Sequence, residues 1–322
     1  MSGPCTFDMR RAALRAAIAL PLLAVGFAVV QGTRQAQAFD ALKPPGLVVG
    51  SPGKRVHLVE VPGPEPAVVF IHGDPGLAQD FEPVQLRLAG RVRTVAVDRP
   101  GYGWSERPFA EMTPLEQAEQ LREALRDRGL KRPVLAGFSF GGPVAIAWAS
   151  AHPDEVQALV LLAPVADAAT GHPIHGVQAQ LAGPLGGAIA HLLGPLLGPQ
   201  AIADGYQDAF FPQAADRQLV ERAQVHFVRP QTLRSSAYDW KALQGQLDAL
   251  AAQERSLKLP VEALFANQDK IVGAAHAAAL EQTVPQAHLA HVDLAGHQLM
   301  STHPDEVVAA VERALARLPG RP

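Results

Sequence analysis

The chain has 322 residues, of which 48% are hydrophobic and 18% charged, so it can bury a sizeable core and is not intrinsically disordered as a whole. Its formal net charge of -3, without a Lys/Arg cluster, excludes a basic face for nucleic acid. The single cysteine, Cys5, excludes an intrachain disulfide and a cysteine-rich metal site.

Residues 1–38 differ in composition from the rest of the chain. Arg10, Arg11 and Arg15 lie ahead of the charge-free stretch 16–30, and Ala36-Gln37-Ala38 has the small-x-small pattern of a cleavage site. A cleaved signal peptide, a retained membrane anchor and a cytosolic amphipathic leader are the three interpretations. Because the arginines precede the apolar stretch, the first two place the bulk of the chain outside the cytoplasm, either exported or membrane-anchored.

Residues 39–54 are rich in proline and glycine, which predicts a linker. Short apolar runs bounded by turn signals follow. Most of them are continuous rather than alternating, which is typical of strands that are buried on both faces. The expected strands are Val56–Val61, Ala67–Ile71, Val92–Val97, Val134–Ala136, Ala158–Leu162, Val261–Ala266 and His288–Leu294.

Helical patterns lie between several of these runs. The segment from Thr113 to Glu116 combines an N-cap, a first-turn proline and a capping-box Glu, and it predicts a helix to about Arg128. A last helix is expected from Pro304 to about Leu318, with acids first and arginines last. Alternating strands and helices predict a mostly parallel α/β sheet flanked by helices.

The alternation stops in residues 166–257, where the patterns are helical without a convincing strand. We expect a helical cap there, inserted between two parts of one core, 55–165 and 258–322. Within the cap, residues 168–203 contain no Asp, Glu, Lys or Arg, and prolines and glycines argue against a membrane span. This stretch is interpreted either as ordinary packing of the cap on the core or as an apolar surface for an acyl chain or lipid.

A five-residue motif carries the chemistry. Gly137-Phe138-Ser139-Phe140-Gly141 follows an expected strand and precedes an expected helix over 142–151. This is the G-x-S-x-G pattern in the strand–turn–helix context that it requires. The turn is so tight that side chains at the glycine positions would collide with the neighbouring strand and helix, and the strain lifts the serine hydroxyl out of the sheet. Ser139 is therefore the candidate nucleophile.

Four further motifs follow strands. They are His72-Gly73-Asp74-Pro75-Gly76, the DRPGYGWS segment 98–105, the FANQDKIV segment 265–272, and Ala295-Gly296-His297. Together and in this order, they resemble the α/β-hydrolase superfamily over about residues 55–320. The resemblance implies an α/β-hydrolase fold with a helical cap and a catalytic triad in the chain order Ser139, Asp269, His297.

The resemblance also implies the roles of these side chains. His297 takes the proton of Ser139 and later protonates the leaving group, while Asp269 fixes the imidazole tautomer and stabilises the imidazolium. Asp167 is the alternative acid, because it follows the expected strand Ala158–Leu162 and some relatives place the acid there. Asp98 also ends a strand, but its loop is interpreted as structural.

The oxyanion hole is expected from the backbone N–H groups of Asp74 and Phe140. Pro75 has no N–H to donate. A carboxylate beside a developing oxyanion would repel it, so the Asp74 side chain is expected to point away. His72 is expected to brace its own turn by hydrogen bonding. No cofactor or metal is expected, since a phosphate loop and zinc-type histidine spacing are both missing from the sequence.

The motifs favour a serine hydrolase that cleaves a small, apolar carboxylic ester through an acyl-enzyme intermediate, as a carboxylesterase or small lipase does. Serine at position 139 argues against epoxide or haloalkane hydrolysis, which uses a carboxylate nucleophile in this superfamily. The alternatives are another triad reaction on the same fold, such as a carbon–carbon bond hydrolase, perhydrolase or peptidase, and a non-catalytic lipid-binding protein. Membrane association through the N-terminus is a further expectation.

Overall fold

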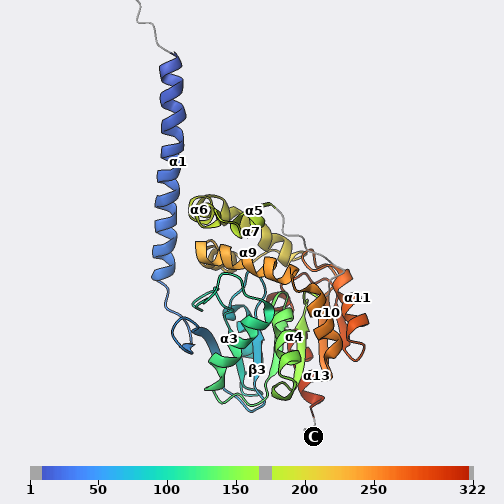
Figure 1. Cartoon of the computed structure of the whole chain (residues 1–322). Coiled ribbons are helices and arrows are strands. Elements are labelled where there is room, and N and C mark those ends of the chain that lie inside the picture. Colours follow the sequence, from blue (N-terminus) through green and yellow to red (C-terminus); the bar gives the residue numbers. More distant parts are fainter. Residues whose placement is uncertain (1–8, 167–175, 319–322) are drawn as a thin grey trace, which may run out of the picture.

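A central sheet organises the protein, whose computed structural model describes residues 9–166 and 176–318. Within these ranges the sheet has eight strands in the order β1-β2-β4-β3-β5-β6-β7-β8, with helices on both faces (Figure 1). The β1–β2 and β2–β4 pairs are antiparallel and the remaining pairs are parallel, so the mostly parallel sheet is confirmed. The strands are β1 (Leu47–Val49), β2 (Val56–Val61), β3 (Val68–Ile71), β4 (Thr94–Val97), β5 (Val134–Phe138), β6 (Ala158–Leu162), β7 (Val261–Ala266) and β8 (His288–Val292).

Strand β1 corrects one expectation. It lies inside segment 39–54, which was expected to be a linker, and it adds an edge strand beside β2, with Val48 opposite His57. Gly46 and Gly50, on either side of it, both have positive φ values, of 88° and 95°. A three-residue strand between two glycines is too short to show a periodicity, so only its pairing with β2 identifies it.

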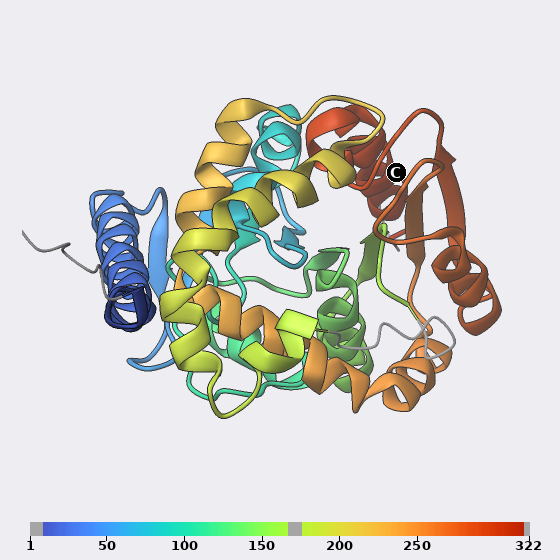
Figure 2. The same cartoon turned by 90° about the horizontal axis from the view of Figure 1, so that it is seen from above.

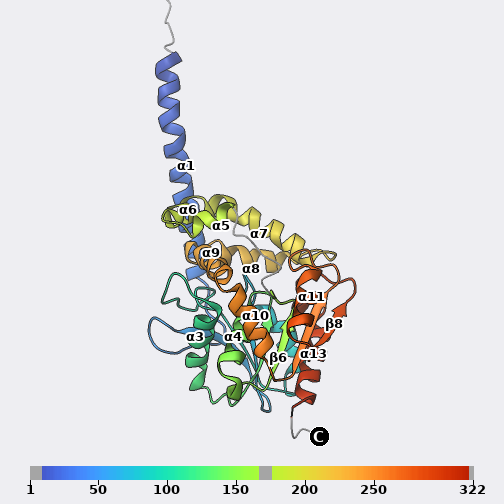
Figure 3. The same ribbon diagram turned by 45° about the vertical axis from the view of Figure 1, so that its right-hand side comes forward.

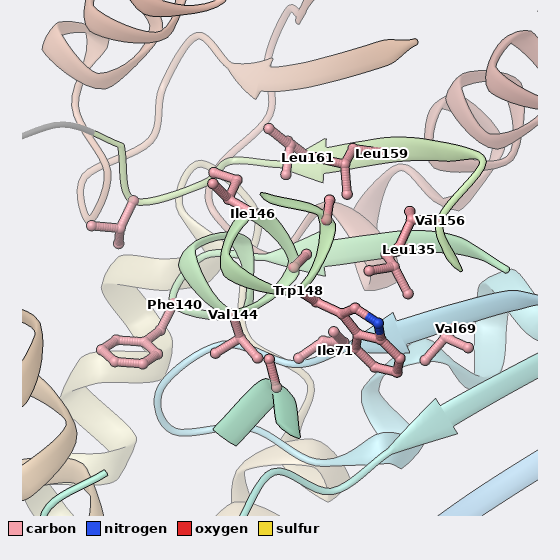
Figure 4. Packing of buried hydrophobic residues seen from close by; sticks show 14 of the residues in the cluster. Val69, Ile71, Leu135, Phe140, Val144, Ile146, Trp148, Val156, Leu159 and Leu161 are labelled. Carbon is pink, nitrogen blue, oxygen red and sulfur yellow. The ribbon is translucent and has the colours of Figure 1, made fainter. Parts of the chain in front are cut away.

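The strand residues alternate between two buried cores. In β3, Val69 and Ile71 belong to the core on one face and Val68 and Phe70 to the core on the other. Both faces are covered by helices, which explains why the strands read as continuous apolar runs. Figure 4 shows the first of these cores, where side chains of α4 (Gly141–Ala151) such as Trp148 lie against the strands.

Further helices of the core follow the expected pattern. The capping box of α3 is present: the Thr113 Oγ1 accepts the N–H of Glu116 at 3.2 Å, and the Glu116 carboxylate accepts the N–H of Thr113 at 2.7 Å. The remaining core helices complete both layers. The elements are η1 (Ala78–Phe81), α2 (Glu82–Leu88), α3 (Pro114–Arg126), η2 (Pro153–Glu155), α11 (Ala274–Thr283), α12 (Leu299–Thr302) and α13 (Pro304–Ala316).

The segment between β6 and β7 is helical in its described part. Figures 1 and 2 show most of its helices spread as a layer over one end of the strands, whereas α10 packs against α4 of the core. This layer is called the cap below. The helices are α5 (Gly176–Leu181), α6 (Gly186–Leu192), α7 (Gly194–Phe210), α8 (Arg217–Phe227), α9 (Pro230–Gln244) and α10 (Leu247–Ser256).

The N-terminal helix α1 (Met9–Asp40) projects beyond the cap (Figures 1 and 3). Its C-terminal part packs against α6, α7 and α8, and Ala28 is buried there. Near the end of the helix, the Phe39 ring stacks on Trp104 with centroids 5.6 Å apart, and the Arg229 guanidinium lies 3.6 Å from the Phe39 centroid. No helix in the described ranges is both long enough and apolar enough to cross a membrane.

Candidate active site

Ser139 lies at the sharp turn between β5 and α4. Its φ of +51° falls in the left-handed region, which is strained for a residue with a side chain. A Cβ on Gly137 would come 2.5 Å from the carbonyl oxygen of Gly141, and one on Gly141 would collide with the carbonyl oxygen of Ile71. Both glycines are therefore required sterically, and the turn has the geometry of a nucleophile elbow.

Asp269 and His297 meet because they follow two neighbouring parallel strands. Ala266 of β7 pairs with Val292 of β8, and the two side chains extend from the loops just beyond these strands. His297 Nδ1 lies 2.7 Å from Asp269 Oδ2, and in the neutral tautomer whose Nδ1–H donates to this carboxylate, Nε2 has a free lone pair and can act as a base. The two side chains are only 6% and 2% exposed, so little water competes for this bond.

The other oxygen of the acid is held by the backbone. Asp269 Oδ1 accepts the N–H groups of Ile271 at 2.7 Å and Val272 at 2.8 Å. These bonds fix the carboxylate in the loop after β7, and with it the orientation of the imidazole of His297. The arrangement is the one in which an acid sets the tautomer of a catalytic histidine.

The histidine lies beside the elbow. The Phe138 ring, one residue before Ser139, is 4.7 Å from the His297 ring between centroids. Counted as whole residues, Ser139 and His297 are 4% and 5% exposed. Among the described residues, no hydrogen bond joins the serine hydroxyl to the imidazole. Such bonds are often long without substrate and shorten in the substrate complex.

The two other acidic residues that follow strands are Asp167 and Asp98. Asp167 lies outside the described residues. Asp98 is buried and structurally engaged: its Oδ2 lies 2.7 Å from His57 Nδ1, and its Oδ1 accepts the N–H of Ala78 at 2.8 Å. Burial alone would raise the pKa of Asp98, but the hydrogen bonds and the charge of His57 outweigh it and hold this pKa below the usual value.

The loop after β3 passes directly against Ser139. A Cβ on Gly73 would come 2.8 Å from the Cβ of Ser139, so only glycine lets the loop approach this closely. His72 braces this loop: its Nε2 accepts the N–H of Arg99 at 2.8 Å, and its Nδ1–H donates to the Gly73 carbonyl at 2.7 Å. Burial and the Arg99 charge lower the pKa of His72 to about 3, which keeps the ring neutral.

The Asp74 carboxylate is turned into the protein and fully engaged. It accepts the hydroxyl groups of Tyr102 at 2.6 Å and Ser236 at 2.7 Å, and the indole N–H of Trp240 at 2.6 Å. Burial raises the pKa of Asp74 despite the nearby Arg99 charge. In the described part of the chain, the backbone N–H of Asp74 makes no hydrogen bond, as an oxyanion-hole donor requires.

Sequence reasoning missed the buried cluster beneath this loop. Arg99 is fully buried and donates to Asp239 at 2.7 Å, to Gln117 at 2.8 Å, and to the carbonyl groups of His72 and Gly73 at 3.0 Å each. Arg99 lies in the motif 98–105 that follows a strand, so the sequence carried a signal for this member of the cluster. Nothing in the local pattern of α9 marks Asp239 as its partner. The described residues contain no group of three His, Cys, Asp or Glu side chains that could hold a metal ion.

Comparisons with known proteins identify the family of the chain. The model of the alpha/beta hydrolase fold family matches residues 66–304. A haloalkane dehalogenase of Agrobacterium fabrum is 35% identical over 114 residues, or 35% of this chain and 37% of the relative. A 2-(acetamidomethylene)succinate hydrolase of Mesorhizobium japonicum is 30% identical over 100 residues, or 31% of this chain and 36% of the relative. These matches thus span little more than a third of each curated relative.

Solved structures extend the likeness of the fold to most of the chain. An alpha/beta hydrolase fold protein from Burkholderia ambifaria has a TM-score of 0.72 and 21% sequence identity, covering 84% of this chain and 97% of that one. The family match, the sheet and the elbow between β5 and α4 lead to the same conclusion: the chain belongs to the α/β-hydrolase fold family.

Proposed function

We propose that the protein is a serine hydrolase that cleaves carboxylic esters through an acyl-enzyme intermediate. The observation that carries the proposal is the strained Ser139 elbow beside the hydrogen-bonded Asp269–His297 pair. A serine hydroxyl is a weak nucleophile until a base removes its proton, and a buried imidazole oriented by a carboxylate is such a base.

Each group has one task in the reaction. His297 Nε2 takes the proton of Ser139 as the serine oxygen attacks the ester carbonyl, and Asp269 stabilises the imidazolium. The N–H groups of Asp74 and Phe140 receive the negative oxygen of the tetrahedral intermediate. The imidazolium then protonates the departing alcohol. Water, activated by His297, attacks the acyl group on Ser139, and the acid leaves.

Position 139 separates this proposal from the reaction of the dehalogenase relative. Displacing a halide in this superfamily uses a carboxylate nucleophile, and this chain has a serine there. The 2-(acetamidomethylene)succinate hydrolase and the carbon–carbon, perhydrolase and peptidase reactions remain compatible with a serine triad. Substrate comparison must separate them, because a shared fold does not fix the substrate.

We also propose that the substrate is apolar and that the protein works next to lipid, exported or anchored outside the cytoplasm. The supporting observation is a set of exposed apolar side chains on α1 and on the cap, which lies beside one end of α1 (Figure 3). Leu185, Leu193 and Leu197 are 73%, 46% and 63% exposed. On α1 the exposed set includes Leu20, Leu22, Leu23, Phe27 and Val29.

The packing of α1 favours retention of this helix over cleavage after Ala38. Ala28, which cleavage would remove, is buried against the cap. Removal of residues up to 38 would expose the faces of α6 and α7 that α1 covers. N-terminal sequencing of the mature protein tests this part: a start at residue 39 contradicts it.

A labelling experiment tests the proposed reaction. A fluorophosphonate reacts only with an activated serine, so the wild type and Ser256→Ala, at an exposed serine, should be labelled while Ser139→Ala is not. Nitrophenyl esters of increasing acyl length should then be hydrolysed faster than a ring-cleavage diketone or a peptide. No labelling of the wild type supports the non-catalytic lipid-binding alternative, and preference for the diketone or peptide supports another triad reaction.

A further inference from the structure

The two residues expected to form the oxyanion hole both send their side chains to one cap helix. The Asp74 carboxylate accepts the hydroxyl of Ser236 and the indole N–H of Trp240, both on α9. The Phe140 ring meets the ring of the same Trp240 edge to face, with centroids 5.3 Å apart. Trp240 therefore contacts both halves of the expected oxyanion hole, one through its N–H and the other through its ring.

A second link runs from α9 through Arg99. Asp239 accepts Arg99 Nη1 at 2.7 Å, and the same guanidinium donates Nη2 to the Gly73 carbonyl at 3.0 Å. It also lies 4.6 Å from the centroid of Phe140. The Gly73–Asp74 peptide is not among the cis bonds, so its C=O and N–H point in opposite directions. A held Gly73 carbonyl therefore sets the direction of the Asp74 N–H.

We propose that α9 is a positioning element for the oxyanion hole, and that Trp240, with Ser236 and Asp239, orients the Asp74 and Phe140 amides toward the serine. These three side chains touch no reacting atom in this scheme. They act through Asp74, Phe140 and Arg99. The inference rests on the proposed serine hydrolase function and extends it, because it makes the cap part of the catalytic geometry rather than only a cover over the site.

The charges of the cluster are compatible with this role. Asp74 and Asp239 face Arg99 and Arg107, with Arg107 Nη2 2.8 Å from Asp239 Oδ1, so two negative and two positive side chains balance. The Tyr102 hydroxyl lies between both carboxylates, 2.6 Å and 3.0 Å away. A balanced cluster adds no net negative charge beside the developing oxyanion, and its hydrogen bonds hold the loop firmly.

Oxyanion-hole donors must lie about 2.7–3.1 Å from the oxygen that becomes negative, and losing one donor costs about 10²–10³ in kcat. A donor that is misdirected rather than removed should cost less. Trp240→Phe keeps the ring against Phe140 and removes only the N–H that holds Asp74. Ser236→Ala removes the other α9 donor to the same carboxylate, and Asp239→Asn removes the charge that holds Arg99.

The test uses the full chain and a short nitrophenyl ester, with kcat divided by the concentration of sites that a fluorophosphonate titrates. We expect Trp240→Phe and Asp239→Asn each to lower kcat by about tenfold, and Trp240→Phe with Ser236→Ala by up to about a hundredfold, with KM changed by less than about twofold. An alkylboronic acid, which forms a tetrahedral anionic adduct with the serine, should lose affinity in the same proportion.

A matched control is available at Trp148 in the last turn of α4. Its indole N–H has no acceptor in the described ranges, and Figure 4 shows its ring between Ile71 and Val69, away from Phe140. Trp148→Phe should leave kcat and boronate affinity unchanged.

Two results overturn the inference while the proposed function stands: kcat per titrated site within twofold of wild type in the α9 variants, or a rise in KM alone. A cluster that only fastens the cap would give the first result together with a lower unfolding temperature. Should Trp240→Phe fold poorly, kcat per titrated site and KM are measured for Ser236→Ala alone and judged by the same limits. A wild type that is neither labelled nor active overturns the proposed function, and the inference with it.

Discussion

The Ser139 elbow and the interface between α9 and the loop after β3 hold the same site by different means. The elbow is fixed by backbone sterics, since Gly137 and Gly141 leave no room for a Cβ and Ser139 keeps a positive φ. The α9 interface consists of hydrogen-bonded side chains from distant parts of the chain. Arg99 and Asp239, for example, are separated by 140 positions.

This difference predicts two kinds of failure. A backbone turn cannot adjust gradually, so changes at the nucleophile and its base should remove the chemistry. A hydrogen-bonded interface can shift by fractions of an ångström, so changes in α9 should reduce the rate while substrate still binds. The expected effect of a substitution therefore decreases from the elbow outward.

The largest effect is expected at the nucleophile. Ser139→Ala should lower kcat for ester hydrolysis by about 10⁶-fold, because triad members act as a unit. Steady-state turnover of a nitrophenyl ester by the purified variant measures this. Ser256→Ala, at an exposed serine of α10, is the control and should keep full activity. Turnover by Ser139→Ala within tenfold of wild type contradicts the assignment of the nucleophile.

The acid should matter next. Asp269→Asn keeps the shape of the side chain but favours the wrong tautomer of His297, and it should lower kcat by about 10⁴-fold. Asp167→Asn is the matched comparison and should change kcat little. Turnover of the same ester by both variants gives the ranking. The opposite ranking would place the acid after β6 instead of β7.

Exposed leucines of the cap allow a test of the lipid-facing surface. Leu185→Asp with Leu197→Asp should lower the fraction of protein that floats with phospholipid vesicles by about tenfold, since a charge in the lipid interface is costly. Leu86→Asp, at a leucine of α2 that is 65% exposed, is the matched control and should not change flotation. Equal flotation of all three proteins means that the charge-free stretch is ordinary cap packing.

A smaller effect is expected on stability at low pH. Burial and Arg99 lower the pKa of His72 from 6.5 to about 3. Between these pH values the unfolded chain binds a proton that the folded chain does not. The free energy of unfolding should therefore fall as the pH drops from about 6.5 toward 3, by up to about 1.4 kcal/mol per pH unit from this group.

Urea unfolding across this pH range measures that slope. His72→Gln should make it shallower, whereas His191→Gln, at an exposed histidine of α6, should leave it as in the wild type. A slope that stays the same in His72→Gln would show that the ring does not stay neutral in the folded protein.

Local sequence patterns were sufficient for most of the fold. The bounds of β2, β6 and β7 agree with the expected strands, because a sheet covered on both faces needs mostly apolar strands. The elbow glycines were predicted for the steric reason that the structure shows. The pairing of Asp269 with His297 was implied by the family resemblance, and the structure supplies its geometric reason, since β7 and β8, the strands that the two residues follow, are neighbours.

Interactions between distant segments were beyond local patterns. The expected position of the Asp74 carboxylate, away from the nucleophile, had a reason in charge repulsion but no named partner. Ser236 and Trp240 lie more than 160 residues later, on a helix whose pattern shows only amphipathic packing. The exposure of Leu185 and Leu197, in contrast with the buried Leu181, likewise depends on how the cap helices pack.

The acyl-enzyme is the central claim, and rapid-quench mass spectrometry tests it most directly. Wild-type protein is mixed with excess nitrophenyl butyrate, quenched in acid within milliseconds and digested. The account predicts a butyryl group on the peptide that contains Ser139, formed with a burst of about one equivalent of nitrophenol and undetected in Ser139→Ala. Continued turnover with that peptide unmodified, or with the acyl group on another residue, would contradict the account.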